Sequence, residues 1–370
     1  MNPQIDFQKD QNDGILRFRL KNVNVSFANA IRRTALSNIP LIVMKTFPHE
    51  ESMCNIFSNT THLSDNIIKQ RLKCIPIHHN ASTYFNLNNY GDYELVLQHE
   101  NKEAFEITLT TEYFQLRNKQ TNEFLPASEV HKIFPSDKIT NDYIDLVRMK
   151  PIISNVPGDN IHLTCDFTVD CAFSDGGYNA VSNCSYGCTV DETKQNEILV
   201  RKIEEWTAEN KNIDLETQDW LMLDGMRIIV PNSFDFIVET VGQYTNIDII
   251  RQCCNVLIRQ LQQINQQITE KKIKINVSST TLKNAFEIEL SNEDHTIGKV
   301  FEFMFLQKYF EATPNILTFC VMDKAHPHNN FITIKLAYNM EVDNSVVNGH
   351  LQTCSLEAIA LFEMIKSNLR

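Results

Sequence analysis

The chain carries the same short pattern twice, and this repetition limits its fold more than any other feature. Residues 15–20 alternate apolar and basic side chains as a strand does, and an apolar helical pattern follows after a polar spacer and ends before Pro40. Residues 286–310 repeat strand, five-residue spacer and helix, 270 positions later. The aligned pairs are Leu20 with Leu290, Ser26 with Thr296, Phe27 with Ile297, Ala28 with Gly298 and Ile31 with Phe301.

The two copies continue to match further along the chain. Ser26 and Thr296 are hydroxyl residues at the expected helix starts, so we predict that they are the N-caps. Each copy then has an alternating strand, 232–240 or 331–338, followed by a helix, about 247–269 or 350–369. A chance match of two common motifs is the alternative. Four elements in one order and register favour a duplication.

The helical patterns predict that the two copies pack on each other. The helix from about 297 to 310 is apolar nearly all round, so one small unit cannot bury it alone. The helix over 247–269 has an apolar seam of coiled-coil spacing, opposite a face rich in Gln and Asn. We therefore expect a pseudo-dimer within one chain. Its expected interface comprises Phe27, Ile31, Ile250, Leu257, Leu261, Ile264, Thr296, Gly298, Phe301, Phe305, Phe362 and Ile365.

Short alternating strands interrupt the first copy and predict an inserted, mainly β domain. The expected fold class is α+β, with three parts. They are a discontinuous larger dimerisation unit over 1–48 and 225–272, the insertion over 49–224, and a smaller dimerisation unit over 273–370.

The charge of the chain bears on the class of partner. There are 46 acidic and 34 basic residues, a net charge of −12, which argues against a free-standing nucleic-acid binder. Any contact with DNA or RNA is therefore expected to be indirect, through a complex. No apolar run is long enough to cross a membrane, and the start of the chain does not resemble a signal peptide. With ten cysteines at this length, we expect reduced thiols and an intracellular protein.

Several segments resemble one protein family. FANAIRRTALSNIP (27–40), LSDNIIKQRLKCIPI (63–77) and PNSFDFIVETVG (231–242) resemble the alpha-subunit family of RNA polymerase, which includes the larger alpha-like protein of archaeal polymerases and the third subunit of eukaryotic RNA polymerase II. NEDHTIGKVFEFMF (292–305) and KAHPHNNFITIKL (324–336) resemble its smaller partner, which is the small alpha-like protein of archaeal polymerases or the eleventh subunit of RNA polymerase II.

This resemblance implies a non-catalytic assembly platform in which two normally separate partners are fused. Such a platform recruits the second-largest and largest polymerase subunits, which hold the active site, and small zinc-binding subunits are further expected partners. Fusion is a feature of large DNA viruses. The implied location is a cytoplasmic viral factory or the virion if the chain is viral, and the nucleus if it is cellular.

The resemblance also assigns roles to individual residues. It implies that Asn29, Arg32 and Arg33 face the second-largest subunit, where two guanidinium groups can bind carboxylates. The alternative is a solvated pair near a helix C-terminus. The Glu293–Asp294 pair precedes a helix, whose positive N-terminal end stabilises negative charges. This position fits either a structural role or contact with a large subunit.

Support for a metal site or for catalysis is weak in this sequence. Cys165, Cys171, Cys184 and Cys188 are clustered, but their spacing is not that of a zinc knuckle, and buried reduced thiols are the alternative to metal ligands. We expect no cofactor and no catalytic residue, since phosphate-binding and hydrolase motifs are missing. A thiol-dependent enzyme acting through Cys165 or Cys188 is the competing hypothesis.

Overall fold

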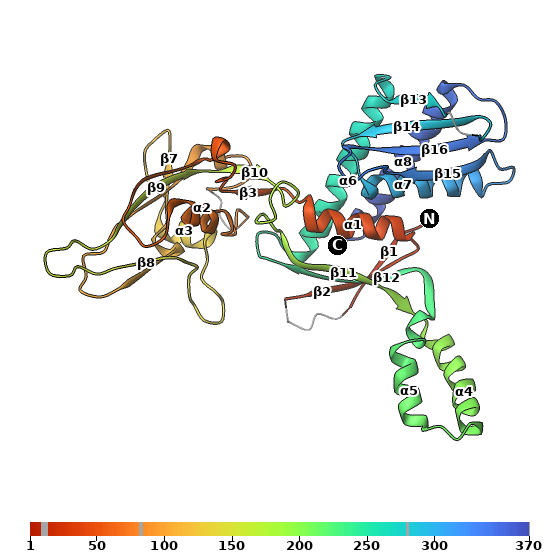
Figure 1. The fold of residues 1–370 in the computed structure, drawn as a ribbon, viewed down its shortest axis with the longest axis horizontal. Coiled ribbons are helices and arrows are strands. Elements are labelled where there is room, and N and C mark those ends of the chain that lie inside the picture. The colour runs from red at the N-terminus through yellow and green to blue at the C-terminus, as the bar shows by residue number, and fades with distance from the viewer. Residues whose placement is uncertain (9–13, 81–83, 279–280, 370) are drawn as a thin grey trace. The chain divides into compact units, whose positions relative to one another are not determined.

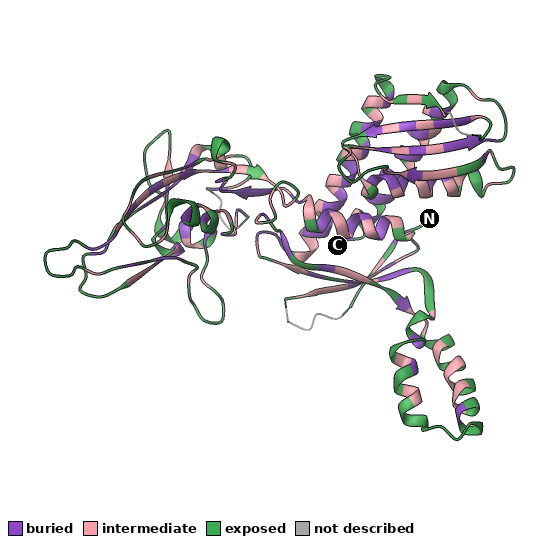
Figure 2. Ribbon diagram, viewed as in Figure 1, coloured by how far each residue is buried: buried purple, intermediate pink, exposed green. Residues whose placement is uncertain are grey.

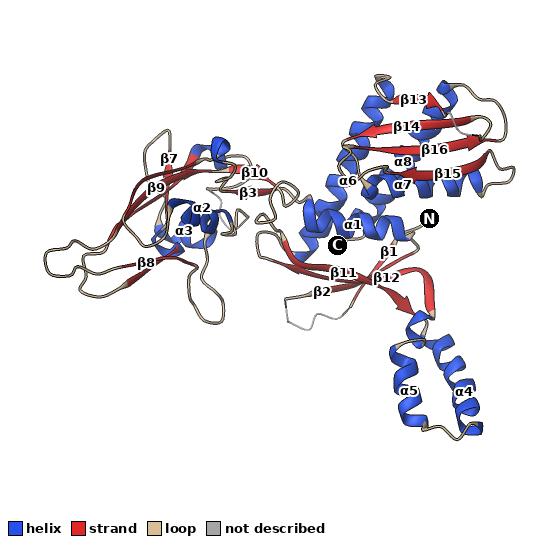
Figure 3. Ribbon diagram, in the orientation of Figure 1, coloured by secondary structure: helices blue, strands red, loops and turns tan. Residues whose placement is uncertain are grey.

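The computed structural model describes residues 1–8, 14–80, 84–278 and 281–369. These residues form two compact units, which are described separately. Unit 1 comprises Met1–Ala35, Asn183–Glu239 and Ile250–Arg370, and unit 2 comprises Leu36–Ser182 and Thr240–Ile249. Helices and antiparallel sheets occur in both, which confirms the α+β class (Figures 1 and 3).

Two four-stranded sheets of the same strand order carry the repeated pattern. The first has the order β1-β2-β12-β11 and the second β13-β14-β16-β15. Their strands are β1 (Gln4–Phe7), β2 (Leu16–Lys21), β11 (Val181–Val190), β12 (Ile229–Thr240), β13 (Lys274–Val277), β14 (Ala285–Ser291), β15 (Leu317–Asp323) and β16 (Phe331–Tyr338).

The two copies agree in register as well as in order. Leu20 lies opposite Phe234 in the first sheet, and Leu290 lies opposite Ile332 in the second. The helices that follow are α1 (Val25–Ser37) and α6 (Asn246–Thr269) in one copy, and α7 (His295–Phe305) and α8 (Asn344–Ser367) in the other. Because α6 and α8 both have 24 residues and follow matching strands, the predicted pair of like units is confirmed.

The helix caps differ from the prediction by two residues in both copies. The Ser26 backbone N–H donates to Asn24 Oδ1 at 2.9 Å, and the Thr296 N–H donates to Asp294 Oδ1 at 2.7 Å. Asn24 and Asp294 are thus the capping residues, and the prediction of Ser26 and Thr296 was wrong. The side-chain oxygen of Asn or Asp reaches the first-turn N–H groups as well as a hydroxyl does, so residue type alone could not decide between them.

A helical hairpin forms part of unit 1. It consists of α4 (Glu192–Ala208) and α5 (Ile213–Met222), followed by the short turn η4 (Gly225–Arg227). The hairpin joins β11 to β12, which belong to the first sheet, and for that reason it groups with unit 1. The boundaries of unit 2, at Leu36–Ser182 and Thr240–Ile249, therefore differ from those of the expected insertion over 49–224. The two expected dimerisation units do not separate either, because they share one compact unit.

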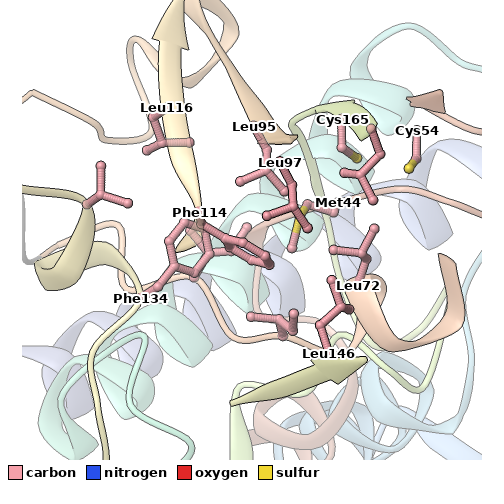
Figure 4. Close-up of a cluster of buried hydrophobic side chains, with 14 of the residues drawn as sticks. Met44, Cys54, Leu72, Leu95, Leu97, Phe114, Leu116, Phe134, Leu146 and Cys165 are labelled. Atoms are coloured by element: carbon pink, nitrogen blue, oxygen red, sulfur yellow. The ribbon is translucent and has the colours of Figure 1, made fainter. Parts of the chain in front are cut away.

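Unit 2 is mainly β and has its own core. Its four-stranded sheet has the order β4-β9-β5-β7, and two further pairs are β6 with β8 and β3 with β10. The elements are β3 (Leu41–Val43), β4 (Cys54–Asn59), α2 (Asp65–Lys73), β5 (Tyr93–Glu100), β6 (Ile107–Thr110), β7 (Gln115–Asn118), α3 (Ala127–Ile133), β8 (Asp145–Met149), β9 (Asn160–Asp166) and β10 (Thr168–Asp170). Leu95, Leu97, Leu72 and Phe114 are among its buried side chains (Figure 4).

None of the helices within the described ranges combines the length and the apolar character that a bilayer crossing requires.

Candidate assembly interface

Helix α1 packs its apolar face against helices of the second copy. The Phe27 ring lies 5.0 Å from the ring of Phe362 in α8 and 6.1 Å from that of Phe303 in α7, measured between centroids. The buried residues of α1 are Phe27, Ala28, Ala30, Ile31, Thr34 and Ala35. The spacing of these residues places one apolar stripe along the helix, which is the stripe that the second copy covers.

The long helices α6 and α8 supply the rest of the buried seam. Hydrogen bonds also join the copies here: Ser355 Oγ of α8 donates to the Leu261 carbonyl, and Arg251 Nη2 of α6 donates to the carbonyl of Leu369, which follows α8, both at 3.2 Å. Buried along the two helices are Ile250, Leu257, Leu261, Ile264, Phe362 and Ile365. All six were expected at this interface, and for Leu261 and Phe362 a direct contact with the other copy is seen.

Arg33 is directed to the second copy rather than away from it. Its Nη2 lies 2.6 Å from Asp294 Oδ2, and its Nε donates to Thr296 Oγ1 at 2.9 Å. Thr296 therefore belongs to the interface as expected, but as a hydrogen-bond acceptor and not as a cap. The expectation that Arg33 points outward differs from this geometry, because the Asp294 carboxylate at the start of α7 attracts the guanidinium.

Asp294 and Glu293 are neighbours with opposite pKa shifts. Burial alone would raise the pKa of Asp294, but hydrogen bonds from Thr296 and the Arg33 guanidinium hold that pKa below its usual range. Burial, aided by the nearby Asp294 charge, raises the pKa of Glu293 to about 8. At neutral pH the first carboxyl is therefore ionised, and the second is mostly protonated.

Gly298 in α7 faces the sheet of its own copy. A Cβ at this position would lie 2.7 Å from Ile332 Cδ1 in β16 and 2.7 Å from Met322 Cγ in β15. The glycine thus lets α7 approach its own sheet, whereas the sequence pattern predicted it at the interface between copies. Phe301 and Phe305, one and two turns further along α7, are fully buried.

One face of α1 is left open in unit 1. Val25 is 48% exposed, and Asn29 and Arg32 are half-buried. Their spacing of four and then three residues places them on the same face of the helix. Arg32 Nε and Nη2 both donate to Asn29 Oδ1, at 3.0 and 2.9 Å. This bond fixes the guanidinium on a face that the second copy does not cover.

The four clustered cysteines occupy different environments. Cys165 is buried, opposite Cys54 across β4 and β9, and Cys184 is buried with its pKa raised to about 12 by desolvation. Cys171 is half-buried and Cys188 is exposed. In the part of the chain that the structure describes, no three or more His, Cys, Asp or Glu side chains gather as metal ligands would.

The partner of Arg33 was missed from the sequence. Asp294 was noted only as a charge near the start of a helix, although the opposite charges of the two residues were a signal for pairing. Which of two adjacent arginines reaches across depends on the rotation of α1, and that rotation is set by packing.

Comparison with known proteins supports this interpretation of the geometry. Residues 17–261 match the model of the RNA polymerase Rpb3/Rpb11 dimerisation domain. The DNA-directed RNA polymerase subunit Rpo3 of Pyrococcus furiosus is 26% identical over 258 residues, which cover 68% of this chain and 92% of that protein. Of the first copy, the match to the family model covers α1, β11 and β12 in full and most of β2 and α6. This chain belongs to the RNA polymerase Rpb3/Rpb11 dimerisation-domain family.

Proposed function

We propose that the chain is a non-catalytic assembly platform of a multisubunit DNA-directed RNA polymerase. The observation that carries this proposal is the pair of like units in one chain, which cover each other's apolar helices. Membership of the dimerisation family supports it. The second copy then stands in for a smaller, normally separate partner, and the chain is a fusion of the two, consistent with a viral origin.

The open face of α1 is the proposed contact with the second-largest subunit. Asn29 and Arg32 lie there, and Arg32 offers its remaining donors to partner carboxylates. Arg33 takes a different role, since it joins the two copies. The largest subunit and small zinc-binding subunits are further proposed partners, and DNA and RNA are reached only through the complex. The proposed location follows the origin: a viral factory or virion, or the nucleus if the chain is cellular.

Purification of the tagged chain from its native source at high salt tests this function. The expected result is stable co-purification with the two largest polymerase subunits. The variant Arg32→Glu should fold normally and lose the second-largest subunit, whereas Lys194→Glu on α4 is a matched charge-reversal control. Recovery of the wild-type chain as a lone monomer would contradict the proposal.

A further inference from the structure

The hairpin of α4 and α5 carries apolar side chains that the described residues of unit 1 leave uncovered. Leu215, Met222 and Leu223 are 59%, 78% and 67% exposed. Figure 2 shows α5 exposed along most of its length. Apolar groups of this size gathered on one element of a protein surface are typical of a binding site for another protein.

Leu215 and Met222 line one side of α5, and Leu223 directly follows the end of the helix. Leu215 and Met222 are seven residues apart, two turns of helix, and Asp219 lies between them on the same side. Leu223 follows one turn after Asp219. We call Leu215, Asp219, Met222 and Leu223 the hairpin stripe. A methionine in such a stripe adapts its shape to a partner at small energetic cost.

The charge of α5 indicates what the stripe binds. The helix has three carboxylates, Asp214, Glu216 and Asp219, and no lysine or arginine. None of the three forms an ion pair with any of the described residues. Asp214 and Glu216 lie in the first turn, where the helix dipole favours them. Asp219 lies beyond that turn and has no such compensation.

We propose that the hairpin stripe docks another protein subunit through an apolar strip bordered by lysine or arginine. The apolar residues supply the buried contact, and Asp219 supplies the charge that a basic border complements. Nucleic acid does not fit, because the carboxylates of α5 repel phosphates. The proposal deepens the assembly function and rests on it, since the partner belongs to the same complex.

A photo-cross-linking experiment in the assembled polymerase tests this inference. Benzoylphenylalanine is placed at position 222, and at position 200 as a control, because Val200 is a similarly exposed apolar residue on α4. The expected product at position 222 is a cross-link to a peptide of another subunit that contains apolar residues flanked by Lys or Arg. The yield at position 200 should be about tenfold lower, the margin that separates a central contact from a peripheral one. Cross-links confined to the chain itself, to a second copy or to nucleic acid would overturn the inference.

Charge variants give a second, independent test. Asp219→Lys should lower the cross-link yield at position 222 about tenfold. Glu204→Lys on α4 makes the same change of charge and should leave the cross-link yield at position 222 unaltered. Both tryptophans of the chain, Trp206 and Trp220, are buried in this hairpin, so their fluorescence shows whether each variant is folded there. An unchanged yield in folded Asp219→Lys would contradict the role of charge.

The design separates this inference from the proposed function. If the wild-type chain does not co-purify with the large subunits, the assembly function fails. If it co-purifies and position 222 gives no cross-link to another subunit, only the docking role of the hairpin stripe fails.

Discussion

The first helices of the two copies, α1 and α7, follow equivalent strands and bury the same aligned positions, but their half-buried faces carry different side chains. In α1 the half-buried Asn29 accepts two hydrogen bonds from Arg32, whereas at the aligned positions of α7 Lys299 pairs with Glu302 at 2.7 Å. The same sheet and register thus support two kinds of helix. In α7 Glu302 also accepts a hydrogen bond from the Met322 N–H of β15 at 2.7 Å, so this face is joined to its own sheet, whereas the Arg32–Asn29 bonds of α1 stay within the helix.

A second contrast lies at the entry to these helices. Positions 22 and 292 are both asparagines with φ of 60°, and positions 24 and 294 both carry the cap. Between them, position 23 is a buried valine, and position 293 is a glutamate whose pKa is raised to about 8. Val23 is buried at the equivalent position of the first copy, so the shared fold shields this position from water in both copies. The same shielding desolvates the Glu293 carboxyl.

The largest expected effect comes from placing a charge where the copies share their core. Phe301→Asp should unfold unit 1, since it removes a fully buried ring and buries an unpaired carboxylate, at a cost above about 4 kcal/mol. Circular dichroism and urea denaturation would measure the loss. The aligned change Ile31→Asp should have the same effect, and a well-folded Phe301→Asp protein would refute the shared core.

A smaller loss of stability should follow from adding a methyl group at position 298, which only the second copy lacks. Gly298→Ala is expected to destabilise by about 1–3 kcal/mol, because the new Cβ would press on Ile332 and Met322. The aligned Ala28 already carries that methyl group in the first copy. Urea midpoints of the variant and the wild type give the difference, and equal midpoints would show that the sheet side chains move aside freely.

Glu293 should make stability depend on pH in a way that Val23 does not. Because its folded pKa is about 8 and its ordinary value is 4.5, the unfolded chain ionises first, so stability falls as the pH rises from about 4.5 to about 8. Glu293→Gln should reduce this fall and be more stable than the wild type by about 1–2 kcal/mol at pH 8. Thermal unfolding between pH 5 and pH 8.5 measures both slopes. If the stability of the wild type and of Glu293→Gln changed with pH at the same rate, the Glu293 carboxyl would be solvated in the folded protein.

The smallest effect distinguishes the two adjacent arginines. Arg33→Ala should destabilise unit 1 by up to about 1 kcal/mol, a modest value because the Arg33–Asp294 pair is more than one-third exposed. Arg32→Ala should change stability by less, since its bond to Asn29 stays within α1. Asp294→Asn combined with Arg33→Ala in a double-mutant cycle isolates the pair. Equal effects of the two single arginine variants would contradict the division of roles.

How much of this was predictable depends on the kind of interaction. The duplication, the α6 seam and the burial of Phe301 follow from apolar spacing, which a sequence displays directly. The caps at Asn24 and Asp294 were missed because several adjacent residues can cap a helix, and only backbone conformation selects one. Helix α5 was missed because its acidic, weakly periodic sequence resembles a loop. The direction of Arg33 depends on contacts across 261 positions of sequence, which local pattern does not record.

The presence of both copies on one polypeptide changes how their pairing depends on concentration. The β13 strand begins five residues after the last residue of α6, so the second copy is always held close to the first. Two separate chains with these surfaces would dissociate on dilution, whereas here the pairing is intramolecular and its extent is the same at any protein concentration. A cell that makes few molecules of this protein therefore still makes each one already paired.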